Sequence, residues 1–309
     1  MRRALALLLV LTLAGCAGSN DDGPDDALSG VEGTASPTAS DLPTPSTSPT
    51  EPVPPKKRLR FAAIGDFGAG NATQQAIADR MCRWRERRSF DLVVTVGDNV
   101  YDVGHPDRFD EAFFRPYDCL LDAGVRFHAT LGNHDIITDN GRPELEEPAF
   151  GFVNERRNYV FRQDGVRFVM ADSNNMRFDW LRSALRTQPG DRWTVVAFHH
   201  PVYATGSYGP TPGFTPRLPR MFRRKGVDLV LNGHEHQYSV TEELRGIRYA
   251  VTGGGGASIR PCGEPAWFTN VCLERFHFLE VLATQEQIEV RAIGPRGRPF
   301  HRFTTDGRD

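Results

Sequence analysis

The sequence predicts an α/β fold, because two kinds of segment alternate along it from Leu59 onward. One kind is a short apolar run, often β-branched, that ends at a glycine or a polar residue, as strands buried on both faces do. These runs are RLRFAAI, FDLVVTV, VRFHATL, VRFVMA, RWTVVAF and VDLVL. The other kind carries apolar residues at helical spacing, from Thr73 to Arg88 and from Phe178 to Arg186. Alternating strands and helices favour layers of helices packed on sheets.

The start of the 309-residue chain is predicted to be an export signal. Met1–Arg3 is basic, and the apolar run Ala4–Leu13 is too short to span a membrane as a mature helix. The sequence Leu13-Ala14-Gly15-Cys16 resembles the lipobox of bacterial lipoproteins, in which the cysteine is lipidated and becomes the new N-terminus. We therefore expect a signal peptide at 1–15 and a lipid on Cys16 that anchors the exported protein to the outer face of the bacterial cell membrane. The alternative is an ordinary signal peptide with a chance cysteine.

A tether is predicted to follow the signal peptide. From Ala17 to about Pro55 the chain consists mainly of Ser, Thr, Pro, Gly and Asp, and it lacks the large apolar residues that a core needs. Its proline-rich part favours extended conformations, so the tether should be semi-stiff. These features give a disordered tether at 16–56 and one folded domain at 57–309.

Four cysteines remain beyond Cys16, and an even number in an exported chain suggests two disulfides. The short separation favours a bridge between Cys262 and Cys272, which would leave Cys82 to pair with Cys119. Free buried thiols are the alternative, since the sequence does not fix the connectivity. The formal net charge of −2 gives no reason to expect nucleic acid as a partner, and the oligomeric state is left open.

Residues that can bind metals follow five of the apolar runs, always on the C-terminal side. In chain order they are Asp66, Asp98 with Tyr101, Asn133 with His134, His199, and His234 with His236. One such residue is ordinary turn chemistry, but five successive strand ends are hard to attribute to turns. Ligands bind at the carboxyl ends of strands in open α/β sheets, so these side chains should gather at one edge. A metal pair about 3.5–4 Å apart could there clamp the attacking and leaving oxygens of a phosphoryl displacement.

Five motifs, GDFG, GDNVY, GNHD, HHPVYATGSYGPT and GHEH, resemble in this order the calcineurin-like metallophosphoesterases. Tyr101 in the second motif is similar to the purple acid phosphatases of that superfamily, in particular the small, mammalian-like type. The resemblance extends from about Lys57 to the C-terminus. It implies a four-layer α/β/β/α sandwich, in which two mixed β-sheets are flanked by helices and a two-metal centre lies at the strand ends.

The resemblance also implies a role for each ligand. Asp98 would bridge the two metals, while Asp66, Tyr101 and His236 would bind a ferric ion. A divalent ion (Fe, Zn or Mn) would be bound by Asn133, His199 and His234, and His134 would face the phosphate from just outside the metals. His200 would take a position that varies in the family. The Tyr101 phenolate would offset the extra positive charge of Fe(III) relative to a divalent ion; the alternative is a tyrosine that packs over the Asp98 turn.

The activity implied by the resemblance is hydrolysis of small phosphate monoesters by attack of a metal-bound hydroxide, with His134, Asp98 and Tyr208 as catalytic residues. Tyr208 departs from the family, which usually has a histidine near the phosphate at this position. A tyrosine is a poorer proton donor at mildly acidic pH, although its hydroxyl can still hydrogen-bond phosphate. A two-metal phosphodiesterase or nucleotidase on the same fold is one alternative, and a surface module without activity is another.

Overall fold

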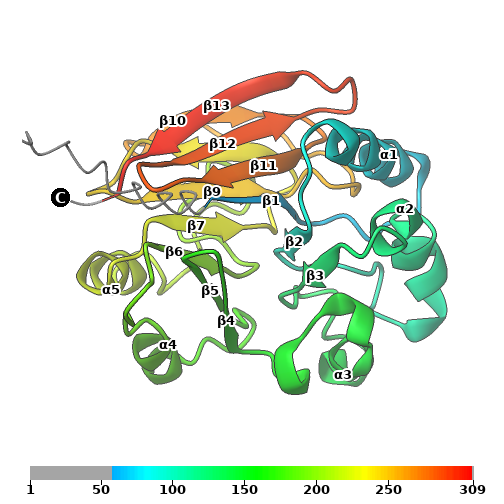
Figure 1. The fold of residues 1–309 in the computed structure, drawn as a ribbon, viewed down its shortest axis with the longest axis horizontal. Helices are drawn as coiled ribbons and strands as arrows, with labels where there is room; N and C mark the ends of the chain where they lie inside the picture. The colour runs from blue at the N-terminus through cyan, green and yellow to red at the C-terminus, as the bar shows by residue number, and fades with distance from the viewer. Residues whose placement is uncertain (1–57, 308–309) are drawn as a thin grey trace, which may run out of the picture. The chain divides into compact units, whose positions relative to one another are not determined.

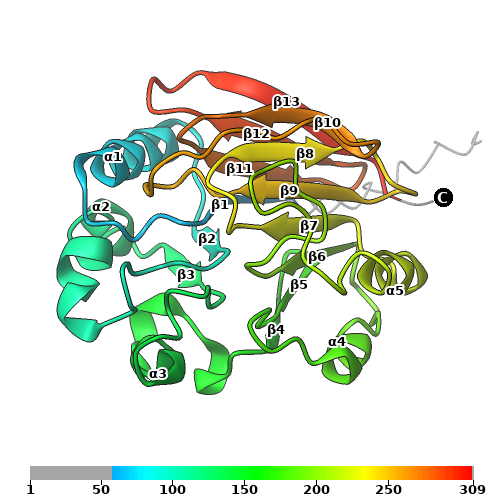
Figure 2. The ribbon, with the colours of Figure 1, turned by 180° about the vertical axis from the view of Figure 1, so that it is seen from behind.

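The structure, a computed structural model, describes residues 58–307. In this part of the chain two β-sheets lie face to face, and helices cover the outer side of each (Figure 1 and, from behind, Figure 2). The first sheet has six strands in the order β13-β12-β11-β1-β2-β3. These strands are β1 (Leu59–Ile64), β2 (Leu92–Thr95), β3 (Arg126–His128), β11 (Phe278–Ala283), β12 (Ile288–Ile293) and β13 (Pro299–Thr305).

The second sheet has seven strands in the order β10-β8-β9-β7-β6-β5-β4. Its strands are β4 (Tyr159–Gln163), β5 (Val166–Met170), β6 (Trp193–Ala197), β7 (Leu229–Asn232), β8 (Tyr238–Thr241), β9 (Arg248–Thr252) and β10 (Thr269–Leu273). Both sheets are mixed. The strands β1, β2 and β3 run parallel in the first sheet, as do β5, β6, β7 and β9 in the second, and the outer strands pair antiparallel.

The main core fills the space between the sheets. Phe61 on β1 and Phe168 on β5 meet edge to face with their ring centroids 5.1 Å apart, and both side chains are fully buried. Because these strands are apolar on both faces, a second set of side chains is left to pack against the helices. On the second sheet, Val196 and Val230 belong to a separate cluster with residues of the covering helices.

Five α-helices flank the sheets: α1 (Ala72–Arg87), α2 (Asp118–Leu121), α3 (Arg142–Glu146), α4 (Phe178–Ala184) and α5 (Leu218–Lys225). Helix α1 packs on the first sheet, where Trp84 meets Phe278 of β11 at 6.5 Å, while α4 and α5 cover the second sheet (Figure 1). The side chain of Asn71 caps α1 by accepting a hydrogen bond from the backbone N–H of Gln74. Single helical turns lie at Pro106–Arg108, Asp110–Phe114, Asp139–Gly141, Pro148–Phe150 and Val153–Glu155.

The predicted four-layer arrangement of two mixed sheets flanked by helices is confirmed (Figures 1 and 2). Each of the six apolar runs contains an observed strand, and the two predicted helices correspond to α1 and α4, the latter ending at Ala184. Both favoured disulfides are present, Cys82–Cys119 and Cys262–Cys272, each with its Cα atoms 6.1 Å apart.

The predicted signal peptide, the lipidated Cys16 and the tether lie outside the described residues. Between residues 58 and 307, none of the helices combines the length and the apolar character that a membrane span requires.

Candidate metal centre

All seven predicted metal ligands come together where the carboxyl ends of parallel strands from both sheets meet. The first sheet contributes Asp66 after β1, Asp98 and Tyr101 after β2, and Asn133 in the loop after β3. The second sheet contributes His199 after β6, and His234 and His236 after β7. The ligand atoms fall into two groups, which share the Asp98 carboxylate.

The first group surrounds the hydroxyl oxygen of Tyr101. This oxygen lies 2.9 Å from Asp98 Oδ2, 3.2 Å from His236 Nε2 and 3.5 Å from Asp66 Oδ1. Donor atoms of Asp66, Asp98 and His236 all lie within 4.8 Å of one another, and the three side chains are buried. This is the set to which the resemblance assigns the ferric ion.

The second group surrounds the side-chain oxygen of Asn133. Asn133 Oδ1 lies 3.0 Å from His234 Nδ1 and 3.1 Å from His199 Nε2. The same His199 nitrogen is 3.5 Å from Asp98 Oδ2. Asp98 therefore faces both groups, as expected for a bridging carboxylate.

The hydrogen bonds of two histidines test whether this donor set suits a cation. His199 Nδ1 lies 2.8 Å from the carbonyl oxygen of Val96, and His236 Nδ1 lies 2.8 Å from that of Ser258. Each Nδ1 must donate to its carbonyl, so in the neutral ring Nε2 carries the lone pair. Both Nε2 lone pairs then point at carboxylate oxygens, which are acceptors as well. A cation between them relieves this repulsion, and nitrogen and oxygen donors are suitable ligands for zinc or iron.

The charges of the site favour a cation in the same way. Although burial disfavours the imidazolium, Asp98 and Asp66 raise the pKa of His199 above its ordinary value. Burial, reinforced by the same two carboxylates, raises the pKa of Tyr101 well above its ordinary value. The tyrosine therefore ionises here only if a cation compensates its charge. The donor set fits a pair of metal ions.

The backbone at the site is tightly constrained. Asp66, Asp98 and His234 adopt left-handed conformations with φ of 55°, 51° and 70°, and each follows a glycine. A Cβ atom on Gly132 would lie 2.1 Å from Asp98 Oδ1, and one on Gly233 would lie 2.5 Å from Asp66 Oδ2. Left-handed non-glycine residues are uncommon and concentrate at functional sites. The glycines are needed because backbone passes directly beside the ligand oxygens.

His134 lies at the edge of the site, beside the Tyr101 ring at a centroid distance of 4.5 Å. Its backbone N–H donates to Asp98 Oδ1 at 3.0 Å, and its Nδ1 donates to the carbonyl oxygen of Asp102 at 2.6 Å. Within the described residues Nε2 has no hydrogen-bond partner, and it is available to a substrate. This position suits the predicted role of His134, which stays a prediction.

His200, the neighbour of the ligand His199, pairs its Nδ1 with the hydroxyl of Ser173 at 2.8 Å. Burial, together with the nearby His199, lowers the pKa of His200 to about 4, so the ring is neutral at mildly acidic and neutral pH. It packs against the ring of the ligand His234 at 4.5 Å. His200 therefore helps to hold the His234 ring in place.

Sequence reasoning gave no role to Asp135, although GNHD contains it. The side chain is fully buried and accepts hydrogen bonds from three backbone N–H groups, those of Asn99, Val100 and Gly132, at 2.8, 3.1 and 2.7 Å. The side-chain amide of Asn99 donates in turn to the buried Glu144 at 2.9 Å. These residues join the two loops that carry Asp98 and Asn133.

Glu235 and Arg260 were also missed. Glu235 lies between His234 and His236 in a run of bends, and its side chain is fully buried. Its Oε1 accepts hydrogen bonds from the backbone N–H groups of Tyr208 and Gly209 at 2.6 and 2.9 Å. The Tyr208 ring lies over the His234 ring at 4.9 Å with an interplanar angle of 26°, and the Arg260 guanidinium carbon lies 4.7 Å from the centre of the Tyr208 ring. Neither Glu235 nor Arg260 follows a sequence pattern that could have indicated it.

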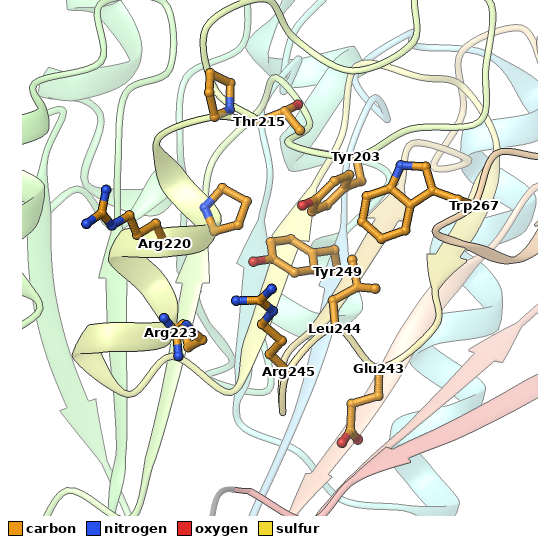
Figure 3. Close-up of a pocket in the computed structure, with 11 residues that line it drawn as sticks. Tyr203, Thr215, Arg220, Arg223, Glu243, Leu244, Arg245, Tyr249 and Trp267 are labelled. Atoms are coloured by element: carbon orange, nitrogen blue, oxygen red, sulfur yellow. The ribbon is translucent and has the colours of Figure 1, made fainter.

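A separate hollow of about 610 Å³ lies between α5 and the turn that joins β8 to β9 (Figure 3). The rings of Tyr203, Tyr249 and Trp267 line one part of it, and arginine side chains from α5 and the turn line another. None of the seven metal ligands lines this hollow, so it is distinct from the metal centre.

Comparison with known proteins agrees with the geometry. The family model described as calcineurin-like phosphoesterase matches residues 59–238. The chain is 24% identical over 299 residues to purple acid phosphatase 17 of Arabidopsis thaliana, covering 82% of this chain and 86% of the relative. It is also 24% identical over 241 residues to the tartrate-resistant acid phosphatase type 5 of Homo sapiens, covering 64% of this chain and 73% of the relative.

Two solved structures share the fold. A purple acid phosphatase from seeds of yellow lupin (Lupinus luteus) superposes with a TM-score of 0.70 at 17% identity, covering 81% of this chain and 54% of that one. GAP50, described as the anchor in the inner membrane complex of Plasmodium, gives a TM-score of 0.70 at 16% identity, covering 82% of this chain and 90% of that one. The family model, the relatives and the assembled ligands agree: the chain belongs to the calcineurin-like phosphoesterase family and is a two-metal phosphatase of the purple acid phosphatase type.

Proposed function

We propose that the chain hydrolyses phosphate monoesters at a centre that pairs Fe(III) with divalent Fe, Zn or Mn. The position of Tyr101 carries this proposal, since its hydroxyl lies within 3.5 Å of Asp66, Asp98 and His236. A buried phenolate beside two carboxylates requires strong compensation, which a trivalent cation supplies better than a divalent one.

Each metal would have three ligands of its own and would share Asp98 with the other. The residues that would hold the ferric ion are Asp66, Asp98, Tyr101 and His236, and those that would hold the divalent ion are Asp98, Asn133, His199 and His234. When bound, the metal pair supplies a hydroxide nucleophile at mildly acidic pH and neutralises the charge of the phosphate.

The protein's own part in the reaction is to hold groups in place around the phosphate. His134 is oriented by the Asp102 carbonyl, so its Nε2 can donate a hydrogen bond to the phosphate or a proton to the leaving oxygen. The Tyr208 ring packs on the His234 ring, and its hydroxyl can hydrogen-bond the substrate. Glu235 accepts hydrogen bonds from the backbone of Tyr208 and Gly209. These bonds fix the Tyr208 loop beside the segment that carries His234 and His236.

Activity on matched esters tests the proposal. The metal-loaded chain should hydrolyse p-nitrophenyl phosphate far faster than bis(p-nitrophenyl) phosphate, whereas the reverse order would favour a phosphodiesterase. Asp98→Ala is the control, because it removes the carboxylate that faces both groups of ligands and should abolish metal retention and turnover together. Near-normal turnover with two retained metals in Asp98→Ala would place the centre elsewhere.

A non-catalytic role is the other candidate, since GAP50, which shares the fold, is described as an anchor. The complete set of seven ligands favours catalysis in this chain. Metal-loaded protein that binds phosphate but turns over neither ester would instead support a surface module.

We further propose that the protein is exported and anchored through a lipid on Cys16. The motif Leu13-Ala14-Gly15-Cys16 supports this proposal. Mass spectrometry of the mature N-terminus should find a lipid-modified Cys16, and Cys16→Ser should abolish both the lipid and cleavage before it. A mature wild-type protein that begins at another residue would rule the anchor out.

A further inference from the structure

An arginine lies at the rim of the metal centre without a carboxylate partner. Arg260 Nη1 donates to the backbone carbonyl of His234 at 2.8 Å, and its guanidinium carbon lies 4.7 Å from the centre of the Tyr208 ring. Between residues 58 and 307, no carboxylate oxygen is within ion-pair distance of this guanidinium. The side chain is half-buried, so its charge is partly removed from water, and the described residues compensate it with a carbonyl and an aromatic ring but with no negative charge.

The position of Arg260 is fixed on several sides. Its backbone N–H donates to the carbonyl oxygen of His236 at 3.0 Å. Two residues further on, Cys262 is tied by a disulfide to Cys272 on β10. The N–H of Gly263 then donates to the carbonyl oxygen of Thr205 at 3.1 Å, in the loop that carries Tyr208. A guanidinium held in this way loses little further freedom when it binds a ligand.

The site has two places that suit an anion, one among the metal ligands and one at Arg260. His234 Nδ1 lies 3.0 Å from Asn133 Oδ1, among the residues that would hold the metals and, with them, the phosphoryl group that is transferred. Tyr208 packs on this ring, and the Arg260 guanidinium packs on the Tyr208 ring and also bonds the backbone carbonyl of His234. Arg260 is thus placed to meet the part of the substrate that extends away from the metals. A planar guanidinium recognises carboxylates and phosphates through paired hydrogen bonds.

We propose that this centre prefers phosphate monoesters whose leaving group carries a second anionic group, either a carboxylate or another phosphate, and that Arg260 binds this group. Tyr208 serves as the platform beneath the guanidinium and keeps it aimed at the mouth of the site. The inference rests on the proposed monoesterase function and adds the class of substrate to it.

The test compares phenyl phosphate with the isomeric 2-, 3- and 4-carboxyphenyl phosphates. The wild type should show a higher kcat/KM for at least one carboxylated ester than for phenyl phosphate. In Arg260→Met, kcat/KM for that ester should fall about 10- to 100-fold more than for phenyl phosphate, as expected for the loss of a charge-assisted hydrogen bond. Arg260→Lys, which keeps the charge but not the paired geometry, should retain part of the preference.

Arg192→Met is the matched control. The guanidinium of Arg192 also lies over an aromatic ring, at 4.1 Å from Trp193, and its Nε also donates to a backbone carbonyl, that of Gln285, at 2.8 Å. Arg192 lies away from the metal ligands, so its removal should leave unchanged the ratio of kcat/KM for the carboxylated ester to kcat/KM for phenyl phosphate. An equal effect of both methionine variants on that ratio would overturn the proposal.

A binding measurement separates this inference from the proposed function. In calorimetry with the metal-loaded chain, phosphonoacetate, which carries a carboxylate beside the phosphonate, should lose affinity in Arg260→Met, whereas methylphosphonate should not. If the difference in affinity between these two ligands is the same in the wild type and in Arg260→Met, the inference is overturned, even where both esters are hydrolysed. Absence of turnover on every ester would overturn the proposed function, and the calorimetry would still decide the role of Arg260.

A result on the wild type alone guards against variants that fail to fold. The preference for the carboxylated ester should weaken as ionic strength rises from about 0.05 to 0.5 M, because salt screens a partly exposed ion pair. A preference that is absent, or that does not respond to salt, would contradict an ionic contact at Arg260.

Discussion

The carboxylate of Asp135 accepts a hydrogen bond from the backbone N–H of Asn99 at 2.8 Å and so joins the loop after β2 to the loop after β3. The same carboxylate accepts from the N–H of Gly132 at 2.7 Å. Each of these donors is the immediate neighbour of a metal ligand, Asp98 in one loop and Asn133 in the other. Asp135 therefore fixes how the loops that carry Asp98 and Asn133 lie relative to each other.

Asp135→Asn should weaken metal binding although every ligand remains. The amide can keep only one acceptor oxygen, and its NH₂ group would face a backbone N–H. Loss of a group that orients metal ligands typically costs 10- to 100-fold in metal affinity, and we expect a loss of about that size here. Titration of the metal-free protein with Zn²⁺ measures it. Asp107→Asn, at an exposed position, is the control, and equal affinities in the two variants would contradict the positioning role.

Tyr101→Phe should remove a charge-transfer band in the visible spectrum. If the phenolate binds Fe(III), the purified wild type is coloured, and the variant loses the colour together with much of its retained iron. Absorption spectra and metal analysis of both proteins provide the measurement. Tyr117→Phe alters a buried tyrosine outside the ligand set and should keep the band. A colourless, iron-free wild type with full activity would replace the ferric ion by a second divalent one.

The sequence indicated the metal ligands because they gather in the short segments that follow apolar runs, and the order of the five motifs pointed to the family. Asp135 could not be recognised in this way. Its partners include backbone N–H groups of its own loop and of another loop, and these leave no trace in residue identity. Arg260 lies in an irregular loop whose course depends on a disulfide, so no period could place it beside His234.

The fold was predictable to a similar depth. The six apolar runs identified β1 to β3 and β5 to β7. Strands β12 and β13, at one side of the first sheet, include partly buried or exposed residues and end in no candidate ligand, so they did not stand out. That the strands form two sheets rather than one followed from the family resemblance, because local patterns do not specify which strands pair.

His277 predicts how stability changes with pH. The ring is fully buried, its Nδ1 donates to the carbonyl oxygen of Arg275, and burial lowers its pKa to about 4. The unfolded chain takes up this proton near the ordinary pKa of about 6.5, whereas the folded chain does not until about pH 4. Between these values the unfolded state binds more protons, so lowering the pH destabilises the fold.

This contribution is fully present above about pH 6.5 and is lost as the pH falls toward 4, which amounts to about 3 kcal/mol. His277→Gln should therefore lose less stability than the wild type between pH 7 and 4, as measured by urea unfolding of the metal-loaded proteins. His105→Gln, which removes a half-exposed histidine, should follow the wild type. Parallel pH profiles for wild type and His277→Gln would show that the buried ring does not titrate as described.

Tyr208 stands where the family usually has a histidine. Its ring is 60% exposed, lies over the His234 ring and under the Arg260 guanidinium, and its backbone is held by Glu235. A phenolic hydroxyl is a poorer proton donor to a leaving alkoxide at acidic pH than an imidazolium is. Tyr208 is therefore suited to positioning the substrate, and we expect proton donation to fall to His134 or water.

Tyr208→Phe should consequently cost little with p-nitrophenyl phosphate, whose leaving group needs no proton. Tyr208→His should selectively raise kcat/KM for alkyl phosphates, such as glycerol 2-phosphate, below about pH 6.5, where the imidazole is protonated. The measurement is kcat/KM for both types of ester across pH in the wild type and the two variants. If Tyr208→Phe loses activity strongly and equally on both esters, the hydroxyl acts on the transferred phosphoryl group itself. If Tyr208→His gains nothing on alkyl esters, position 208 does not reach the leaving oxygen.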